Sequence, residues 1–422
     1  MSFDLPELPE GWAYETLESC SKNGSITYGI VQPGAQVSQG VPIIRVNNFR
    51  DMHLDLSDVM HVQPEIAAKY ERTKLHGGEV LLTIVGTVGQ VAVVSKQLAG
   101  FNVARAVAVI HPLPKVSADW IALCLRSPLS RHLLVSRANT TVQTTINLKD
   151  LRALPIPVPP EAEREQITAL IGALDDRIAL LRETNATLEA IAQALFKSWF
   201  VDFDPVYAKQ QGIAPAGMDD ATAALFPDGF ESSIIGEIPA GWNVKTLEDL
   251  LVLQRGFDLP APDRIPGAYP IIAASGPSGT HCEAMVKGPG VVTGRSGVLG
   301  RVFLEFGDYW PLNTALWIKE FRAATPCYAY ELLRLLDFKA FNAGSAVPTL
   351  NRNHIHGLPY VIPARACVEA FEQIAEKLHR RVKENERQAQ TLATLRDTLL
   401  PRLISGQLRL PEAEEALAEA VA

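Results

Sequence analysis

Two sets of polar side chains lie in Gly-, Pro- and Asn-rich segments of the chain, and their types could contact nucleic-acid bases. Arg forms paired hydrogen bonds with guanine, Asn and Gln form them with adenine, and Thr can bind phosphates. The first set is Arg45, Asn47, Asn48, Arg50, Arg105, Gln143, Thr144 and Asn147. The second set is Arg255, Ser275, Arg295, Ser296, Asn313, Thr314, Asn351, Arg352 and His354. For each of them taken singly, a turn cap or a surface polar group is an equally good interpretation.

Motifs for covalent chemistry are missing from the sequence. The segment "DFDP" (202–205) lacks the second Pro and the following aromatic of the N/D-P-P-Y/F motif that adenine-N6 methylation needs. A nuclease set, a helicase P-loop and zinc motifs such as H-E-x-x-H are also missing. The glycine patterns "GTVG" and "SGVLG" match no phosphate-binding loop, so we interpret them as tight β-turns. We therefore predict that the chain is not an enzyme.

The cysteines give no sign of a metal site or a disulfide framework. They are five, an odd number, and never stand at C-x-x-C spacing. We interpret them as small core residues and expect no metal or cofactor in this chain. They are Cys20, Cys124, Cys282, Cys327 and Cys367.

Length and composition indicate a globular protein of two or three domains. The chain has 422 residues, of which 47% are hydrophobic and 20% charged. The start "MSFDLPELPEGW" lacks the basic and apolar regions of a signal peptide, and no apolar run reaches the roughly 18 residues of a membrane span. We expect a cytoplasmic protein without a membrane segment.

The formal net charge of -8 is unevenly distributed. Residues 1–155 carry 14 Lys and Arg against 13 Asp and Glu, and residues 236–363 carry 11 against 11. The excess of acidic residues therefore lies between these two segments and at the C-terminus. Both segments remain free to form local basic patches, as contacts with nucleic acid require.

The two nearly neutral segments are copies of one unit. The phrase "LPEGWAYETLES" (8–19) returns as "IPAGWNVKTLED" (238–249), and four further blocks follow in the same order. Short β-branched runs and helical stretches near Asp119–Ser136 and Tyr328–Lys339 predict an α+β domain in each copy. The further pairs are 41–49 with 269–277, 78–94 with 288–304, Asn102 with Asn313, and 141–159 with 345–363.

Each copy is followed by a segment with the heptad pattern of a long helix. Apolar residues recur every seven residues from Ile167 to Leu195 and from Phe371 to Leu399, each with a second series four residues later. About 43 helical residues would form a rod of roughly 60 Å. The pattern predicts a two-helix coiled coil, with ordinary amphipathic helices on separate domains as the alternative.

One Asn interrupts each apolar series, at Asn185 and Asn385. If the helices run antiparallel and these amides pair, the numbers of facing residues sum to 570, which places Trp199 beside Phe371. A polar pair among apolar layers selects one register, because any slip leaves both amides without partners. In this register Arg396 faces Leu174, and we expect its charged head to turn outward.

Two similar domains at a fixed separation suit an asymmetric DNA site with two half-sites and an unread spacer. A rod of fixed length would set the distance between the half-sites, as dimer spacing does for symmetric DNA-binding proteins. The aromatic residues near the end of the first long helix are predicted to form part of the seam between the two helices and part of a partner surface, with a base-stacking platform as the alternative: Phe196, Trp199, Phe200 and Phe203.

At this point the chain resembles a known family, the specificity subunits of type I restriction-modification systems. The match covers almost the whole chain and is most specific at "LFKSWFVDFDP" (195–205) and "LLPRLISGQL" (399–408). Further support comes from the G-W entrances, the P-I-I strands and the "SAVPTLN" and "LPIPVPP" blocks.

This resemblance implies an α+β fold with two target recognition domains, residues 1–155 and 236–363, separated by an antiparallel coiled coil. The coiled coil would comprise the segments 156–205 and 364–411, with a linker at 206–235 and an acidic tail at 412–422. The partners that the resemblance implies are double-stranded DNA, two methyltransferase subunits and restriction/translocase subunits, with one copy of this chain per complex. S-adenosylmethionine, ATP and Mg would bind those partner subunits.

Two other functions stay open at this stage. A stand-alone bipartite DNA-binding regulator would bind its site tightly without methyltransferase subunits. A two-domain enzyme would need a catalytic constellation that neither copy contains. The neutral charge of both copies favours the first interpretation, because such domains alone should bind DNA weakly and with a modest salt dependence.

Overall fold

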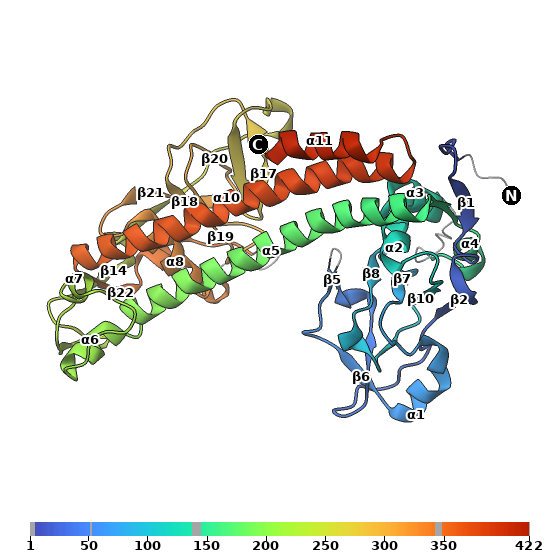
Figure 1. Ribbon diagram of the computed structural model, residues 1–422. Helices are drawn as coiled ribbons and strands as arrows, with labels where there is room; N and C mark the ends of the chain where they lie inside the picture. Colours follow the sequence, from blue (N-terminus) through green and yellow to red (C-terminus); the bar gives the residue numbers. More distant parts are fainter. Residues whose placement is uncertain (1–4, 51–52, 137–144, 342–347, 422) are drawn as a thin grey trace. The chain divides into compact units, whose positions relative to one another are not determined.

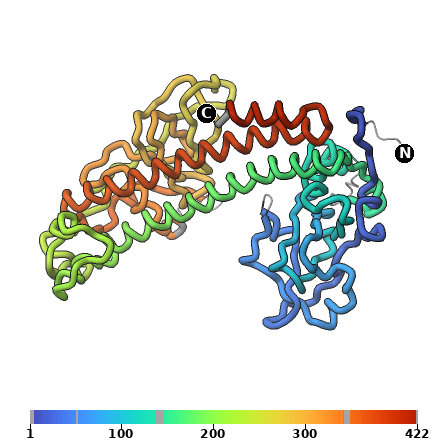
Figure 2. Tube along the Cα trace, in the orientation of Figure 1, coloured from blue at the N-terminus to red at the C-terminus, as the bar shows by residue number. Residues whose placement is uncertain are grey.

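A computed structural model describes residues 5–50, 53–136, 145–341 and 348–421 of the chain. The chain divides into two compact units: unit 1 comprises Met1–Ala179 and Ala389–Ala422, and unit 2 comprises Leu180–Gln388. The long helices α5 (Glu161–Phe200) and α10 (Arg365–Ile404) each contribute residues to both units (Figures 1 and 2). Unit 1 holds the first sequence copy, and unit 2 holds the second.

The first copy contains a four-stranded antiparallel sheet in the order β2-β10-β7-β8 and a three-stranded sheet in the order β6-β3-β9. Its central strand β7 is buried at all four positions, as expected for an apolar run without alternation. The strands are β2 (Ser21–Tyr28), β3 (Val41–Ile44), β4 (Phe49–Arg50), β5 (His53–Leu54), β6 (Met60–Val62), β7 (Val80–Thr83), β8 (Val91–Val93), β9 (Asn102–Val103) and β10 (Val107–Pro112). The helices are α1 (Pro64–Ala67), α2 (Ala118–Arg126), α3 (Pro128–Ser136) and α4 (Leu148–Arg152).

The second copy repeats this topology, with sheets in the orders β15-β21-β18-β19 and β17-β16-β20. In both copies the middle strand of the smaller sheet has one antiparallel and one parallel neighbour. The duplication predicted from the sequence is therefore confirmed. The elements are β15 (Leu251–Arg255), β16 (Tyr269–Ala273), β17 (Gly276–His281), β18 (Gly290–Gly294), β19 (Val302–Glu305), β20 (Trp310–Pro311), β21 (Ala315–Phe321), α8 (Pro326–Leu335) and α9 (Arg352–His356).

The repeated G-W phrases open both copies with the same strand pairing. The strand β1 (Ala13–Thr16) pairs with β11 (Pro155–Val158), and β14 (Asn243–Thr246) pairs with β22 (Pro359–Ile362). Ala13 faces Val158, and Asn243 faces Ile362, so the register is the same in both copies. Each copy is thus closed by a strand pair that joins its beginning to its end, immediately before a long helix.

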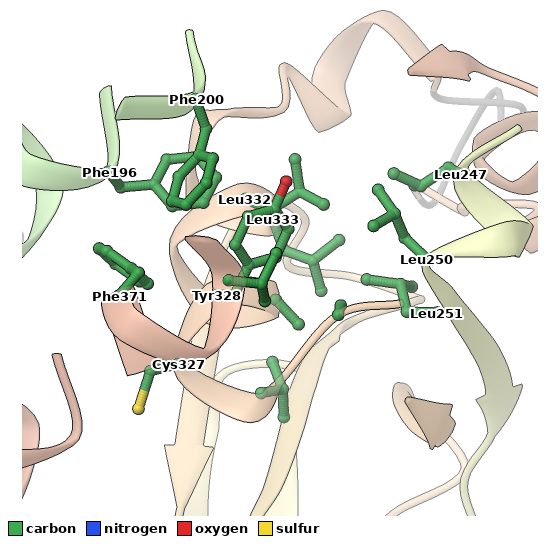
Figure 3. Close-up of a cluster of buried hydrophobic side chains, with 14 of the residues drawn as sticks. Phe196, Phe200, Leu247, Leu250, Leu251, Cys327, Tyr328, Leu332, Leu333 and Phe371 are labelled. Atoms are coloured by element: carbon green, nitrogen blue, oxygen red, sulfur yellow. The ribbon is translucent and has the colours of Figure 1, made fainter. Parts of the chain in front are cut away.

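The core of unit 2 brings the aromatic end of α5 together with α8 and α10 (Figure 3). Phe196 and Phe200 of α5 meet Tyr328 of α8, with the Phe200 and Tyr328 ring centroids 4.9 Å apart. Phe371 of α10 lies 5.6 Å from each of the two Phe rings. The edge-to-face angles are those preferred by buried aromatic pairs.

At the end of α5, the contacts with Phe371 of α10 confirm the part of the prediction that places these rings in the seam between the helices, but the predicted partner surface is wrong. Phe196, Trp199 and Phe200 are at most 4% exposed, and the ring of the half-buried Phe203 packs against Trp242 at 5.8 Å. The spacing of these aromatic residues along the helix fits an exposed patch and a buried cluster equally well. They are buried because they contact rings from α8 and α10, which are far away in the sequence.

The segment predicted as a linker, residues 206–235, is folded onto unit 2. It contains most of α6 (Asp204–Gln210), α7 (Asp220–Ala223) and β12 (Phe230–Ser233), which pairs with β13 (Gly236–Pro239). Phe226, which lies between α7 and β12, is 2% exposed and packs edge-on against Trp199. The Gly- and Pro-rich composition suggested an open chain, but its few aromatic residues attach it to the core.

Most of the predicted acidic tail lies in α11 (Leu410–Val421), where Ala413 is fully buried. Just before it, Gly406 has a positive φ of 70°, and a Cβ there would collide with Pro9. Glu163 of α5 accepts hydrogen bonds from the Trp12 indole at 3.1 Å and from Arg409 at 2.9 Å. Within unit 1, the end of the chain is therefore fastened to the entrance of the first copy.

The two long helices run antiparallel, with their amides in contact as predicted. In unit 2, Asn385 Nδ2 donates to Asn185 Oδ1 at 2.8 Å, and Asn185 Nδ2 donates to the Val382 carbonyl at 3.1 Å. The rings of Trp199 and Phe371 are 6.2 Å apart, as the same register requires. Asn385 is 1% exposed, so this polar contact lies within an apolar interior.

Arg396 does not turn outward. In unit 1 its Nη1 donates to Asp175 of α5 at 2.8 Å, and the same carboxylate accepts from Arg126 of α2 at 3.1 Å. These three side chains are only 13–19% exposed. Because a partly buried charge needs a partner, this carboxylate ties α2, α5 and α10 together.

Glu372 of α10 caps the N-terminus of α8 in unit 2. Its carboxylate accepts from the Thr325 hydroxyl at 2.6 Å and from the backbone N–H groups of Cys327 and Tyr328 at 3.0 and 3.2 Å. Thr325, at the N-cap position, makes no cap of its own. A carboxylate here satisfies free N–H groups and complements the positive end of the helix dipole.

No helix in the part of the chain that the structure describes is long and apolar enough to cross a membrane.

The amide contact predicts unequal effects of two substitutions. Asn185→Leu leaves the buried Asn385 amide without its partner and should cost about 1–3 kcal/mol. Asn385→Leu should cost less, because Asn185 keeps its bond to the Val382 carbonyl. The double Leu variant should regain stability over Asn185→Leu. Urea unfolding followed by tryptophan fluorescence measures this order, and equal midpoints for the two single variants would contradict it.

The Glu372 cap predicts that Glu372→Ala destabilises unit 2 by about 1–2 kcal/mol. Glu376→Ala is the matched control, since Glu376 lies one turn away and only pairs with Arg380 at the surface. That loss should stay below about 0.5 kcal/mol. Thermal unfolding of both variants measures the difference, and similar melting temperatures would argue against the cap.

Candidate functional site

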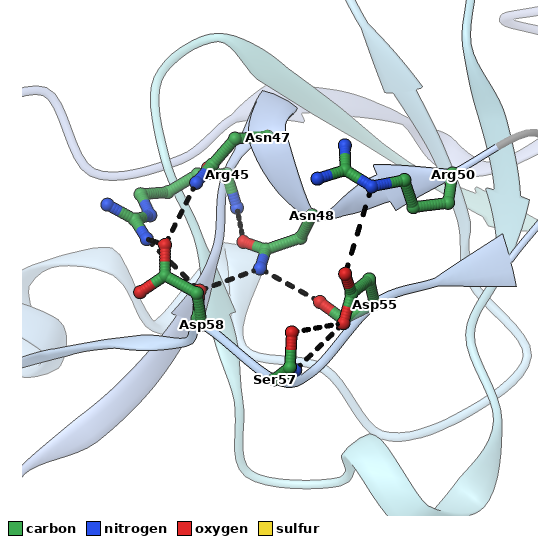
Figure 4. A network of polar contacts seen from close by, with 7 residues as sticks. All are labelled: Arg45, Asn47, Asn48, Arg50, Asp55, Ser57 and Asp58. Carbon is green, nitrogen blue, oxygen red and sulfur yellow. Dashed lines mark hydrogen bonds and ion pairs between the residues drawn. The ribbon is translucent and has the colours of Figure 1, made fainter. Parts of the chain in front are cut away.

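In the first copy, Asp58 organises the candidate base-reading residues that follow β3 (Figure 4). Arg45 Nη2 donates to its carboxylate at 3.0 Å, and the exposed Asn47 amide donates to the same oxygen at 3.3 Å. Arg50 is exposed and lies 3.8 Å from Asp55. Hydrogen bonds from the Ser57 hydroxyl and backbone N–H lower the pKa of Asp55, which keeps this carboxylate charged. Arg45, Asn47 and Arg50 are thus held at the surface by two carboxylates.

Asn48 is a structural residue in this arrangement, which corrects its assignment as a base contact. It is 1% exposed, and its Oδ1 accepts from the Arg45 backbone N–H at 2.8 Å. Its Nδ2 donates to the carbonyls of Asp55 and Asp58 at 3.0 and 2.9 Å. Both groups of the amide are therefore occupied by the backbone of its own loop.

Asn147 and Asn351 are helix caps at equivalent positions. Asn147 Oδ1 accepts from the Asp150 N–H at 2.8 Å, and Asn351 Oδ1 accepts from the Asn353 N–H at 3.0 Å. They start α4 and α9, respectively. For these two residues, the structure therefore supports the role of a cap, which the sequence left as an alternative to a base contact.

In the second copy, Asp258 has the role of an organising carboxylate. It accepts from the Asn313 amide and lies 3.4 Å from Arg255. Arg295 donates to the Asn313 backbone carbonyl at 3.4 Å, and the Thr314 hydroxyl accepts from the Ala274 N–H at 3.3 Å. Four of the predicted residues therefore gather around the start of β21.

Three of the remaining residues of the second set, Ser275, Ser296 and Arg352, also have contacts that involve backbone groups. Arg352 donates to the Leu253 carbonyl at 3.2 Å, while His356 Nε2 accepts the Leu253 N–H at 2.8 Å. Burial lowers the pKa of His356, which favours the neutral imidazole that can accept. The Ser275 carbonyl accepts from Arg301 at 2.9 Å. Ser296 pairs with Thr349 through a β-bridge, and His354 is exposed.

Strand register corrects the sequence alignment of the two copies. The equivalent bridges Ile30–Ala104 and Phe257–Leu312 place Arg105, not Asn102, at the position of Asn313. Asn102 is 1% exposed and accepts from the Thr73 hydroxyl at 2.6 Å inside the first copy.

The glycine turns of the two copies also align differently from the sequence comparison. The bridges Val85–Thr145 and Ser296–Thr349 match Gly86 with Gly297, one residue away from the predicted correspondence. Both glycines have positive φ, 80° and 87°, as expected for β-turns.

Two predicted residues, Gln143 and Thr144, lie outside the described residues. The residues that sequence reasoning missed are the carboxylates Asp58 and Asp258. Both are mostly exposed acidic side chains in loops, at 75% and 68%, and only their contacts with Arg and Asn identify them.

The described ranges contain no group of three or more His, Cys, Asp or Glu side chains that could hold a metal ion. The geometry instead provides hydrogen-bond donors and acceptors on two surfaces of related architecture. Such groups can form directional hydrogen bonds with a ligand.

Comparisons with known proteins all find similarity to the specificity subunits of type I restriction systems. A family model described as the type I restriction modification DNA specificity domain matches residues 30–190. The specificity subunit of the type I restriction enzyme EcoBI from Escherichia coli is 31% identical over 198 residues, which are 44% of this chain and 42% of that protein. The specificity subunit of MjaIX from Methanocaldococcus jannaschii is 22% identical over 365 residues, 79% of this chain and 78% of that protein. The match thus spans less than half of the E. coli relative.

A solved structure supports the likeness at the level of the fold. The S subunit of a type I restriction-modification system from M. genitalium matches with a TM-score of 0.61 at 14% identity. The match covers 94% of this chain and 98% of that one.

The site geometry predicts that Asn48 acts on stability rather than on recognition. Asn48→Ala removes three buried hydrogen bonds and should cost about 1–3 kcal/mol or more. Asn47→Ala, one residue away and exposed, should cost less than about 0.5 kcal/mol. Thermal unfolding checks the difference, and the reverse order would contradict the assignment.

Proposed function

We propose that this chain is a specificity subunit of a type I restriction-modification system, and that its two copies each read one half of a split, asymmetric DNA site. The observation that supports this most strongly is the pair of copies with the same strand topology and different surface side chains. A shared backbone presents similar loops, while unlike side chains select unlike base sequences. The spacer between the half-sites would be set by the paired long helices.

The proposed partners are two methyltransferase subunits and the restriction/translocase subunits of such a system, around one copy of this chain. The chemistry would belong to these partners, which would bind S-adenosylmethionine, ATP and Mg. The chain itself would be a non-catalytic subunit that works in the cytoplasm. The neutral charge of both copies supports this division of labour, because neighbouring subunits could then supply much of the phosphate contact.

A stand-alone DNA-binding regulator is the second candidate. It would have the same architecture, but it would have to bind DNA tightly by itself. Copies with balanced charge offer little electrostatic affinity, which makes this function the weaker proposal.

The proposed function predicts the loss of one adenine-modification motif when the gene is deleted from its host. Sequencing that detects modified adenines should find one split motif in the wild type and none in the deletion strain. Replacing residues 236–363 by the corresponding segment of another specificity subunit should change one half of the motif only. Unchanged adenine modification in the deletion strain would reject the function, and changes in both halves would reject the division between the copies.

A further inference from the structure

The strand register identifies one backbone position that has the same surroundings in both copies, occupied by Arg105 in the first and Asn313 in the second. Each residue directly follows a parallel β-bridge, Ile30–Ala104 or Phe257–Leu312. Two residues later, the N–H of Val107 or Ala315 bonds back to the carbonyl of Ala104 or Leu312, at 2.9 Å in both copies. The same tight turn therefore holds both positions.

The backbone just after β7 and β18 confirms this equivalence on the opposite side of Arg105 and Asn313. The N–H of Ile84 bonds to the Ala106 carbonyl at 2.8 Å, and the N–H of Arg295 bonds to the Thr314 carbonyl at 2.9 Å. Arg105 and Asn313 are thus flanked by the same ladder on both sides. Neither contact depends on side-chain type, so the backbone frame is shared while the side chain is free to differ.

In the second copy, Asp258 fixes the orientation of the Asn313 amide. A carboxylate only accepts hydrogen bonds at neutral pH, so the side of the amide that faces Asp258 must be its NH2 group. The contact uses one N–H and leaves the other N–H and the Oδ1 for a ligand. One donor beside one acceptor is the pattern that pairs with the N7 and N6 groups of adenine.

In the first copy, the same region is less polar. Tyr28 and Val31 stand at the backbone positions of Arg255 and Asp258, and they are 47% and 37% exposed. Arg105 is exposed, and its side chain has no hydrogen bond or ion pair with the residues that the structure describes. An unpaired guanidinium keeps its fork of donors for the O6 and N7 acceptors of guanine.

We propose that this shared position is the base-reading position of each copy: Asn313, oriented by Asp258, reads an adenine in one half-site, and Arg105 reads a guanine in the other. This inference rests on the proposed function. Asp258 is a positioning residue here, because it acts through the Asn313 amide. Its contact with Arg255 places a second donor beside the same base.

The test uses the assembled methyltransferase complex and DNA duplexes in which each purine of the modification motif is replaced in turn. Arg105→Ala should lose roughly 5- to 150-fold of the discrimination at one guanine of one half-site, as expected for a bidentate contact. Asn313→Ala should lose the same at one adenine of the other half-site. Asn243→Ala is the matched control, because Asn243 is exposed on β14 and should leave every position unchanged.

Asp258 is tested by its own pair of variants. Asp258→Asn allows the Asn313 amide to turn, so discrimination at that adenine should fall while the melting temperature of the complex stays unchanged, since Asp258 is largely exposed. Asp258→Glu keeps an accepting carboxylate and should restore at least part of the discrimination. A loss of melting temperature together with equal weakening at all positions would show a structural role instead.

The outcomes separate this inference from the proposed function. If the wild-type complex selects a split motif, and Arg105→Ala and Asn313→Ala select it with the same discrimination, the assignment is wrong and the proposed function stands. If the wild-type complex selects no split motif, the proposed function fails, and this inference fails with it.

Discussion

The antiparallel contact between α5 and α10 is the constraint on which the rest of the structure depends. Both helices contribute to both units, and the buried amide of Asn385 finds its partner only when Asn185 lies opposite. A shift of one helical turn would leave both amides in an apolar interior. The same register supports the aromatic core of unit 2 and, in unit 1, brings Arg396 to Asp175.

Each copy is attached to these helices by polar contacts with different chemistry. In unit 1, Asp175 joins two arginines from α2 and α10. In unit 2, Glu372 caps α8. Because these contacts are specific and partly buried, each favours one seating of its copy on the helix pair. Rigid seating would give the loops of each copy a defined place from which to contact a ligand.

Much of this architecture could be predicted from the sequence, because duplication and heptad spacing are local patterns. The repeated G-W phrases indicated the duplication, which the equivalent strand pairings of the two copies bear out. The two interrupting Asn residues predicted the correct helix register. The errors concern long-range contacts. Phe196 and Phe200 have the spacing of an exposed stripe, but rings from α8 and α10 bury them. Asn102 aligned with Asn313 by residue type, while the strand pairing puts Arg105 in that place. Exposed acidic residues such as Asp258 carry no recognisable signal in the sequence. Only the side chains that folding brings beside them identify their role.

The central claim is that one fold, present twice, reads two different halves of one DNA site. Purine-methylation interference on the assembled complex tests it most directly, because it reports the purines at which methylation of a groove edge, at N7 of guanine or N3 of adenine, blocks binding. The account predicts two clusters of interfering purines with different base patterns, separated by a gap in which methylation has no effect. A single continuous cluster, or two clusters with the same pattern in symmetric orientation, would contradict it.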